Sequence, residues 1–207
     1  MSDSAPPASG VFFSKHRLEA LCDGVFAVVM TLLVLEIKPE LEPHAGNEAV
    51  AHTLRALASP LFAYAFTFLI SCIFWNLHHR KFTLLRHTNA IHTTLTLVFL
   101  FAVTLLPVSI SIYIRAKSSP LAHAVYFGNF TLIALPLLLS WLYARRAGLT
   151  DPVSPLNLTQ SLTARMIALT LLGVIMMIAS YFDWPYLILL ALPVILYLRR
   201  QRQTATP

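Results

Sequence analysis

The sequence predicts an all-α, polytopic membrane protein with six transmembrane helices. Hydrophobic residues make up 57% of the 207-residue chain and charged residues only 12%, against about 25% charged residues in an ordinary soluble domain. Long apolar runs alternate with short charged connections, which leaves no room for a soluble domain of usual size. We therefore expect one membrane domain at residues 15–200, between a mobile tail at 1–14 and a second tail at 201–207.

Six apolar runs mark the expected helices, and clusters of charged residues bound them. The runs cover about residues 18–37, 57–77, 89–114, 121–144, 163–182 and 184–198. Pro107 and Pro136 lie inside the third and fourth runs, where packed neighbours can satisfy the freed carbonyls. The last run is short and follows Asp183-Trp184-Pro185, so both a sixth span and a re-entrant hairpin fit it.

Lysine and arginine predict the orientation of these helices. An even number of spans puts both ends of the chain on one side. Eleven basic residues then share that side, namely Lys15, Arg17, Arg80, Lys81, Arg86, Arg145, Arg146, Arg165, Arg199, Arg200 and Arg202. Four fall on the other side, namely Lys38, Arg55, Arg115 and Lys117. By the positive-inside rule we expect both termini in the cytoplasm.

Several classes of function find no support in the residues. The net charge of +6 comes from the ends of apolar runs, as orientation requires, so nucleic-acid binding is not expected. Cys22 and Cys72 show no metal-binding or disulfide spacing, and free thiols are expected. Because no nucleophile elbow, zinc pair or phosphate loop occurs, we predict no enzyme, resident metal or cofactor. For His92 and His123, hydrogen bonding is favoured over a haem or proton-relay role.

The first run contains a carboxylate, Asp23. In hydrocarbon a lone carboxylate costs roughly 2.5–3.5 kcal/mol on insertion scales, so an intramembrane charge needs a partner. Arg17 is the nearest candidate, and the end of the second run brings hydrogen-bonding groups to the same depth. These groups are Trp75, Asn76 and His79. They predict either a buried network that fixes the helix pair or an ordinary interfacial belt of aromatic residues.

A second feature of the first run is a stripe of small or apolar residues. Gly24, Val28, Thr31 and Leu35 recur at spacings of four, three and four, so they share one helix face. This pattern is typical of a packing seam between helices. If identical subunits surround an axis, the same stripe becomes a set of rings that line a pore.

Together these segments resemble the transmembrane protein 175 potassium-channel family, and its bacterial members in particular. The family's motif is Arg, three residues, then Phe-Ser-Asp. Arg17 and Asp23 match it, whereas Leu21 and Cys22 replace Phe and Ser. The segment 75–79 with Phe82 is similar to the family's Trp and paired-His segment, and the segment 105–107 to a Leu-Leu-Pro sequence on its third helix.

The resemblance implies a homotetramer of six-helix subunits around a central pore that is permeable to potassium and lacks a TVGYG filter. By position, Val28 and Leu35 become apolar constrictions and Thr31 a ring of hydroxyls. Arg17, Asp23, Trp75, Asn76 and His79 become the structural network that holds the pore helices. The expected partners are other copies of the chain, membrane lipid and monovalent cations. The alternative is a secondary transporter coupled to protons or cations, although a matched pair of broken helices is not visible.

Overall fold

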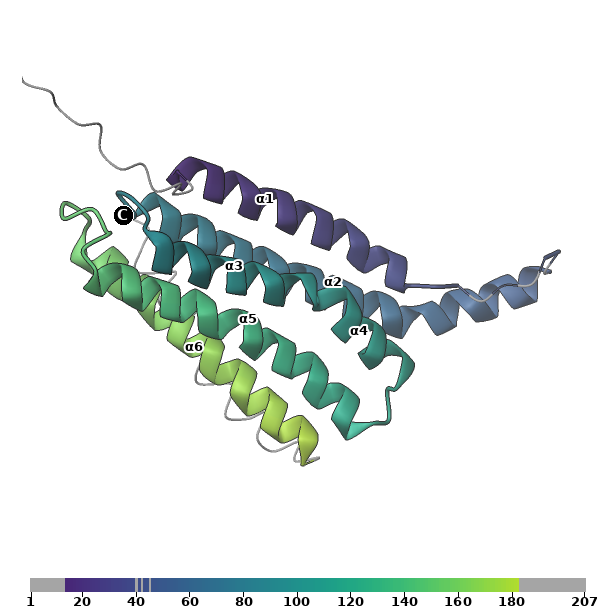
Figure 1. Cartoon of the computed structure of the whole chain (residues 1–207). Helices are drawn as coiled ribbons and strands as arrows, with labels where there is room; N and C mark the ends of the chain where they lie inside the picture. The colour runs from purple at the N-terminus through teal and green to yellow at the C-terminus, as the bar shows by residue number, and fades with distance from the viewer. Residues whose placement is uncertain (1–13, 40, 42, 45, 183–207) are drawn as a thin grey trace, which may run out of the picture.

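The structure, a computed structural model, describes residues 14–39, 41, 43–44 and 46–182. Within these residues the regular secondary structure is helical, apart from one isolated bridge between Leu85 and Thr150 (Figure 1). The helices are α1 (Lys15–Leu32), the 3-10 turn η1 (Leu33–Glu36), α2 (Asn47–Thr83), α3 (Ala90–Thr104), α4 (Leu106–Arg115), α5 (Pro120–Arg146) and α6 (Leu156–Tyr181).

The described residues form five helical segments that are long and apolar enough to cross a membrane, with α1 joined to η1 and α3 joined to α4 as single spans. These confirm the first five predicted runs. The predicted sixth span, 184–198, lies outside the described residues, as do the predicted tails apart from Ser14. That serine caps α1, where its hydroxyl accepts a hydrogen bond from the backbone N–H of Arg17 at 3.4 Å.

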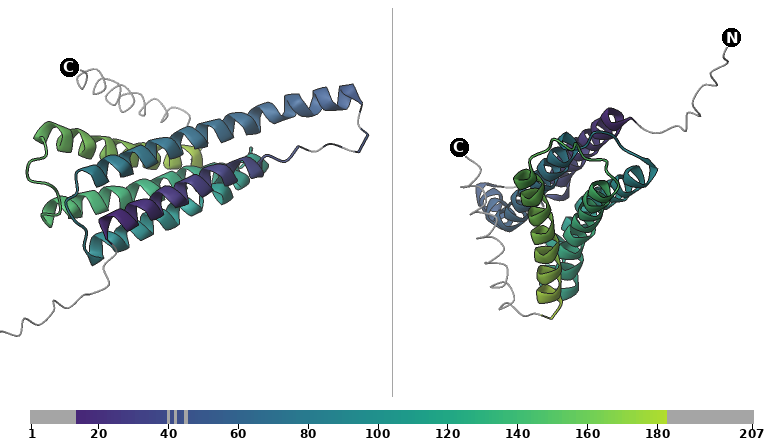
Figure 2. Two further views of the ribbon diagram at one scale, coloured as in Figure 1. Left: turned by 90° about the horizontal axis from the view of Figure 1, so that it is seen from above. Right: turned by 90° about the vertical axis from the view of Figure 1, so that its left-hand side faces the viewer.

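The second helix is much longer than its apolar run. α2 begins at Asn47 rather than 57 and ends at Thr83 rather than 77. Its 37 residues span about 55 Å at 1.5 Å per residue, well beyond a hydrocarbon core of about 30 Å. Figure 2 shows its first turns running past the other helices. Hydropathy finds only the part that lies in lipid, so the polar extension escaped the prediction.

The third span breaks near Pro107 into α3 and α4. Proline lacks the N–H that would donate to the carbonyl of Val103 four residues earlier, so the regular helical bonding is interrupted at this point. The buried side chain of Asn129 on α5 donates to the carbonyl of Ala102 at 3.1 Å and accepts from the hydroxyl of Ser109 at 3.1 Å. The kink is thus stabilised by a neighbouring helix, as membrane helices require. Pro136, by contrast, lies inside an unbroken α5.

The core forms around α5, which packs most extensively against α6 and α3. Trp141 is fully buried and donates its indole N–H to the hydroxyl of Thr163 on α6 at 2.8 Å. A Cβ at Gly173 would lie 2.7 Å from the hydroxyl oxygen of Thr131. Glycine therefore permits the close approach of α6 to α5.

At one end of the bundle, two connections meet. The backbone N–H of Arg86, after α2, donates to the carbonyl of Leu149 at 2.8 Å, and that of Asp151 donates to the carbonyl of Leu84 at 2.9 Å. Leu18 of α1 packs into a small apolar cluster at this end with Phe82 and Leu85. The start of α1 is therefore fixed against the end of α2.

Candidate functional site

The first helix has one face that packs into the protein and one that does not. The buried face follows helical spacing and consists of Leu18, Cys22, Phe26, Val29 and Leu33, each at most 3% exposed. On the opposite face Val28 is 57% exposed and Leu35 is 62% exposed. An apolar face of this size without a partner among the described residues marks α1 as a helix that meets lipid, another subunit or a pore.

The exposed face contains the whole predicted stripe. Gly24, Val28, Thr31 and Leu35 are all exposed, and a Cβ at Gly24 would meet no atom within 4 Å. The Thr31 hydroxyl donates to the carbonyl of Val28 at 2.7 Å. This bond uses the only hydroxyl proton, so the oxygen can act only as an acceptor, and its two lone pairs are available to a cation or water on the exposed side. Within the part of the protomer that the structure describes, the stripe is therefore not a packing seam.

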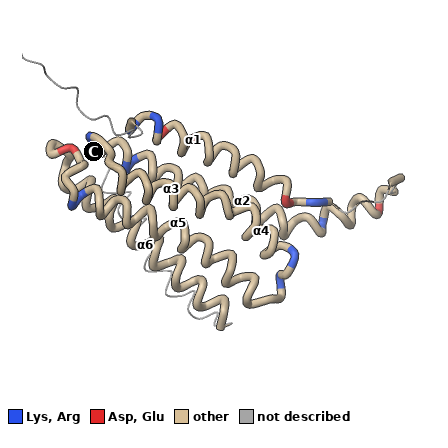
Figure 3. Tube along the Cα trace, in the orientation of Figure 1, with Lys and Arg blue, Asp and Glu red and all other residues tan. Residues whose placement is uncertain are grey.

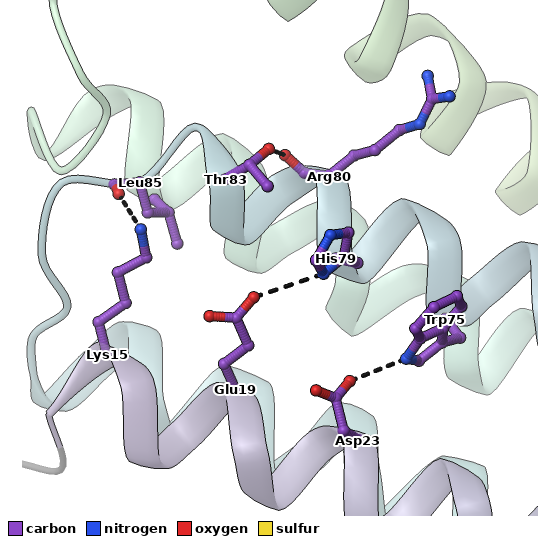
Figure 4. Close-up of polar contacts among 8 residues, drawn as sticks. All are labelled: Lys15, Glu19, Asp23, Trp75, His79, Arg80, Thr83 and Leu85. Carbon is purple, nitrogen blue, oxygen red and sulfur yellow. Dashed lines mark hydrogen bonds and ion pairs between the residues drawn. The ribbon is translucent and has the colours of Figure 1, made fainter.

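Three contacts join successive turns of α1 to α2 and the connection after it, and we call them the α1–α2 ladder (Figure 4). The Lys15 ammonium donates to the carbonyl of Leu85 at 2.6 Å. The Glu19 carboxylate lies 3.4 Å from Nδ1 of His79. The Trp75 indole N–H donates to the carboxylate of Asp23 at 2.8 Å. The residues of α1 recur every fourth position while those of α2 run backwards, as two antiparallel helices require.

The structure brings together part of the predicted network. Trp75 is the partner of Asp23, and its ring stacks on His79 with 5.8 Å between centroids. Asn76 is exposed, and no hydrogen bond within the described residues joins it to this group. Arg17 is exposed on the first turn of α1, and its role in the network stays a prediction. Asp23 itself is exposed in the protomer, and the choice between a buried network and an interfacial belt stays a prediction.

Sequence reasoning missed two members of the ladder, Lys15 and Glu19. Both lie upstream of Asp23 at intervals of four residues, the spacing that places side chains on one helix face. This regularity was the available signal. Lys15 also fits the charge pattern that orients the helices, which hides its place in the ladder.

Lys81 is one of the basic residues expected to lie at the cytoplasmic surface, but it is not at the surface in the structure. Lys81 is fully buried and donates to the hydroxyl of Ser140 on α5 at 2.9 Å. The two adjacent histidines point in different directions, as helical geometry requires, so that His78 is buried and His79 is exposed.

No cluster of three His, Cys, Asp or Glu side chains suited to a metal occurs in the part of the chain that the structure describes. Cys22 and Cys72 are free thiols.

Comparison with known proteins places this geometry in a family. The family described as "Endosomal/lysosomal potassium channel TMEM175" matches residues 17–107, which hold α1, α2, α3 and the break before α4. The chain is 34% identical over 142 residues to a potassium channel of Streptomyces collinus, a match that covers 66% of this chain and 68% of that protein. It is 31% identical over 134 residues to a potassium channel of Chamaesiphon minutus, covering 63% and 66% respectively.

The fold agrees with a solved structure. The crystal structure of a homologue of the lysosomal potassium-selective channel TMEM175, from Chamaesiphon minutus, superposes with a TM-score of 0.68 at 23% identity. The superposition covers 88% of this chain and 97% of that one. At 23% identity the superposition shows a shared fold. The shared family is shown by the two potassium channels that are 34% and 31% identical in sequence. The chain therefore belongs to the family of the endosomal/lysosomal potassium channel TMEM175.

Proposed function

We propose that this chain is a potassium-permeable cation channel in which α1 lines the pore. The observation that carries the proposal is the exposed stripe of Val28, Thr31 and Leu35, which faces away from the protomer's own core. Two bacterial relatives that are 34% and 31% identical to the chain are named potassium channels. In this proposal the chain catalyses no covalent chemistry and needs no resident cofactor, because an ion that permeates a pore forms and breaks no covalent bond.

The proposed assembly is a homotetramer of six-span subunits, with the four α1 helices around the axis. Each residue of the stripe then becomes a ring. Rings of Val28 and Leu35 form apolar constrictions that gate by excluding water, and the Thr31 ring offers hydroxyl oxygens to passing ions. Because a carbonyl filter of the TVGYG kind is absent from the sequence, discrimination between potassium and sodium is expected to be modest.

The α1–α2 ladder supports this arrangement. A helix that lines an aqueous pore loses part of its packing surface, so it needs other contacts to fix its position. The ladder supplies them through Asp23, Glu19 and Lys15 at the end where basic residues gather. Figure 3 shows blue segments at both ends of the bundle. We propose that the end carrying Lys15 is cytoplasmic, in a prokaryotic inner membrane, with both termini on that side.

Electrical recording tests the channel function. Purified protein is reconstituted in planar bilayers with potassium on one side and sodium on the other, and the reversal potential is measured. We expect passive single-channel currents with a modest preference for potassium. Stoichiometric exchange of protons for cations in liposomes that contain a pH dye, without single-channel currents, would instead establish the secondary transporter.

The position of α1 is tested separately by chemical cross-linking. Leu35→Cys is treated in membranes with a short bifunctional thiol reagent, and Val98→Cys, on α3 and 47% exposed, serves as the matched control. Linked dimers are expected from Leu35→Cys and not from the control. They are also not expected from the wild type, whose native thiols are Cys22 and Cys72. Equal linking of both variants would show that α1 does not surround the axis.

A further inference from the structure

Behind the pore-facing helix lies a cluster of basic side chains that the proposed channel function does not use. His78 and Lys81 of α2 and His92 of α3 are all fully buried. They surround the ring of Phe82, whose centroid lies 4.4 Å from that of His78, 5.8 Å from that of His92 and 5.1 Å from the Lys81 nitrogen. We call His78, Lys81 and His92, together with the Phe82 ring between them, the basic cluster.

The polar atoms of the basic cluster are poorly satisfied by the protein. Neither ring nitrogen of His78 or of His92 has a hydrogen-bond partner among the described residues. Lys81 has one bond, to Ser140, although an ammonium offers three protons. The described residues supply it no carboxylate within ion-pair distance. Buried polar groups in proteins are almost always hydrogen-bonded, so four orphaned nitrogens beside a lysine require a further partner.

We propose that the basic cluster is a binding site for ordered water. A neutral imidazole has one N–H donor and one acceptor nitrogen, while the ammonium only donates. The missing partner must therefore accept from Lys81 and also donate to imidazole nitrogens. Water does both, whereas an anion such as chloride only accepts and would leave the acceptor nitrogens unpaired. Buried waters typically make about three such bonds to groups that lack a partner.

The position of this site gives the water a structural role. The His78 ring stacks on Phe99 of α3 at 5.5 Å, and Phe99 in turn contacts Phe26 on the buried face of α1 at 5.8 Å. Lys81 reaches α5 through Ser140. Water bound to the two histidines and the lysine thus joins α2 to α3 and α5 directly behind α1, and fixes the surface on which that helix rests.

Hydroxyl-radical footprinting tests the site on the intact chain in detergent. X-ray pulses generate radicals from water, so a buried ring is oxidised only when a water molecule lies beside it. We expect Phe82 to be oxidised several-fold faster than Phe130, a buried ring with aromatic contacts from Phe66, Phe74, Tyr126 and Phe127. Equal, slow oxidation of the two rings would overturn the proposal.

Thermal stability of His92→Phe gives an independent measurement. If the nitrogens of His92 were unpaired in a dry core, their removal would raise the melting temperature, because an unsatisfied polar group is lost. If they bind water, the variant leaves water or Lys81 short of a partner, and we expect a lower melting temperature together with loss of Phe82 oxidation. His92→Gln keeps a donor and an acceptor and should retain the oxidation. A stabilised His92→Phe, or unchanged oxidation of Phe82 in it, would overturn the proposal.

Discussion

The indole N–H of Trp75 on α2 donates to the carboxylate of Asp23 on α1 at 2.8 Å, and both side chains are exposed in the protomer. A tryptophan in a membrane helix commonly lies at headgroup depth as an anchor. Here it has a second role, because it supplies the partner that an intramembrane carboxylate needs. The bond joins the helix with the exposed stripe to the longest helix of the bundle.

Loss of this bond should loosen α1. Trp75→Phe keeps an aromatic ring but removes the N–H. We expect it to destabilise the protein by about 1 kcal/mol, less than the roughly 1.5–3 kcal/mol of a hydrogen bond to a charged group, because the site is exposed. Asp23→Ala should have a similar effect, and the double variant should cost less than the sum of the two. Thermal unfolding in detergent measures all three. Strict additivity of the two changes would contradict a direct interaction.

Polarity on the stripe should control conduction. Val28→Asn and Leu35→Asn each place an amide where we propose an apolar constriction, and a wetted constriction lowers the barrier to ions. We expect a several-fold increase in single-channel conductance or open probability in planar bilayers. Val98→Asn is the matched control, since Val98 is exposed to a similar extent on α3. Wild-type currents from both stripe variants would show that these residues do not line the pore.

The hydroxyl of Thr31 should influence ion preference. Thr31→Val keeps the shape of the side chain and removes the oxygen, so the ratio of potassium to sodium permeability should change, as the reversal potential reports. Thr104→Val is a close control, because Thr104 is also exposed and donates to the carbonyl three residues earlier at 2.7 Å, as Thr31 does. An equal change in both variants would point to a general effect of helix hydroxyls rather than to an ion-contacting ring.

Close packing of α5 and α6 should depend on Gly173. Its replacement by alanine places a Cβ 2.7 Å from the Thr131 hydroxyl oxygen and 3.3 Å from the Thr131 Cα, so the helices must separate. We expect a loss of about 1–3 kcal/mol, the usual cost of overpacking. Gly24→Ala is the control, since a Cβ there meets nothing within 4 Å in the protomer and the gain in helix propensity is the same. Equal melting temperatures for the two variants would refute the close contact.

Much of the fold was predictable because hydrocarbon imposes a strong and simple constraint. A spanning segment must satisfy its own backbone and bury no uncompensated charge, so apolar runs identified α1, α3 with α4, α5 and α6 as helices. Length beyond the lipid was not predictable by this route. The polar first turns of α2, from Asn47, obey the rules of soluble helices and give no hydropathy signal.

Periodicity alone determined the exposed stripe of Val28, Thr31 and Leu35, since the spacing of residues on one helix fixes which of them share a face. Only the tertiary structure decided that this face has no partner in residues 14–182 as described, that Trp75 binds Asp23, and that Lys81 is buried beside His78 and His92 rather than with the surface charges. The physical reason is that contacts between helices depend on their relative depth and rotation. These are set by packing over the whole bundle, which a linear pattern of residues does not record.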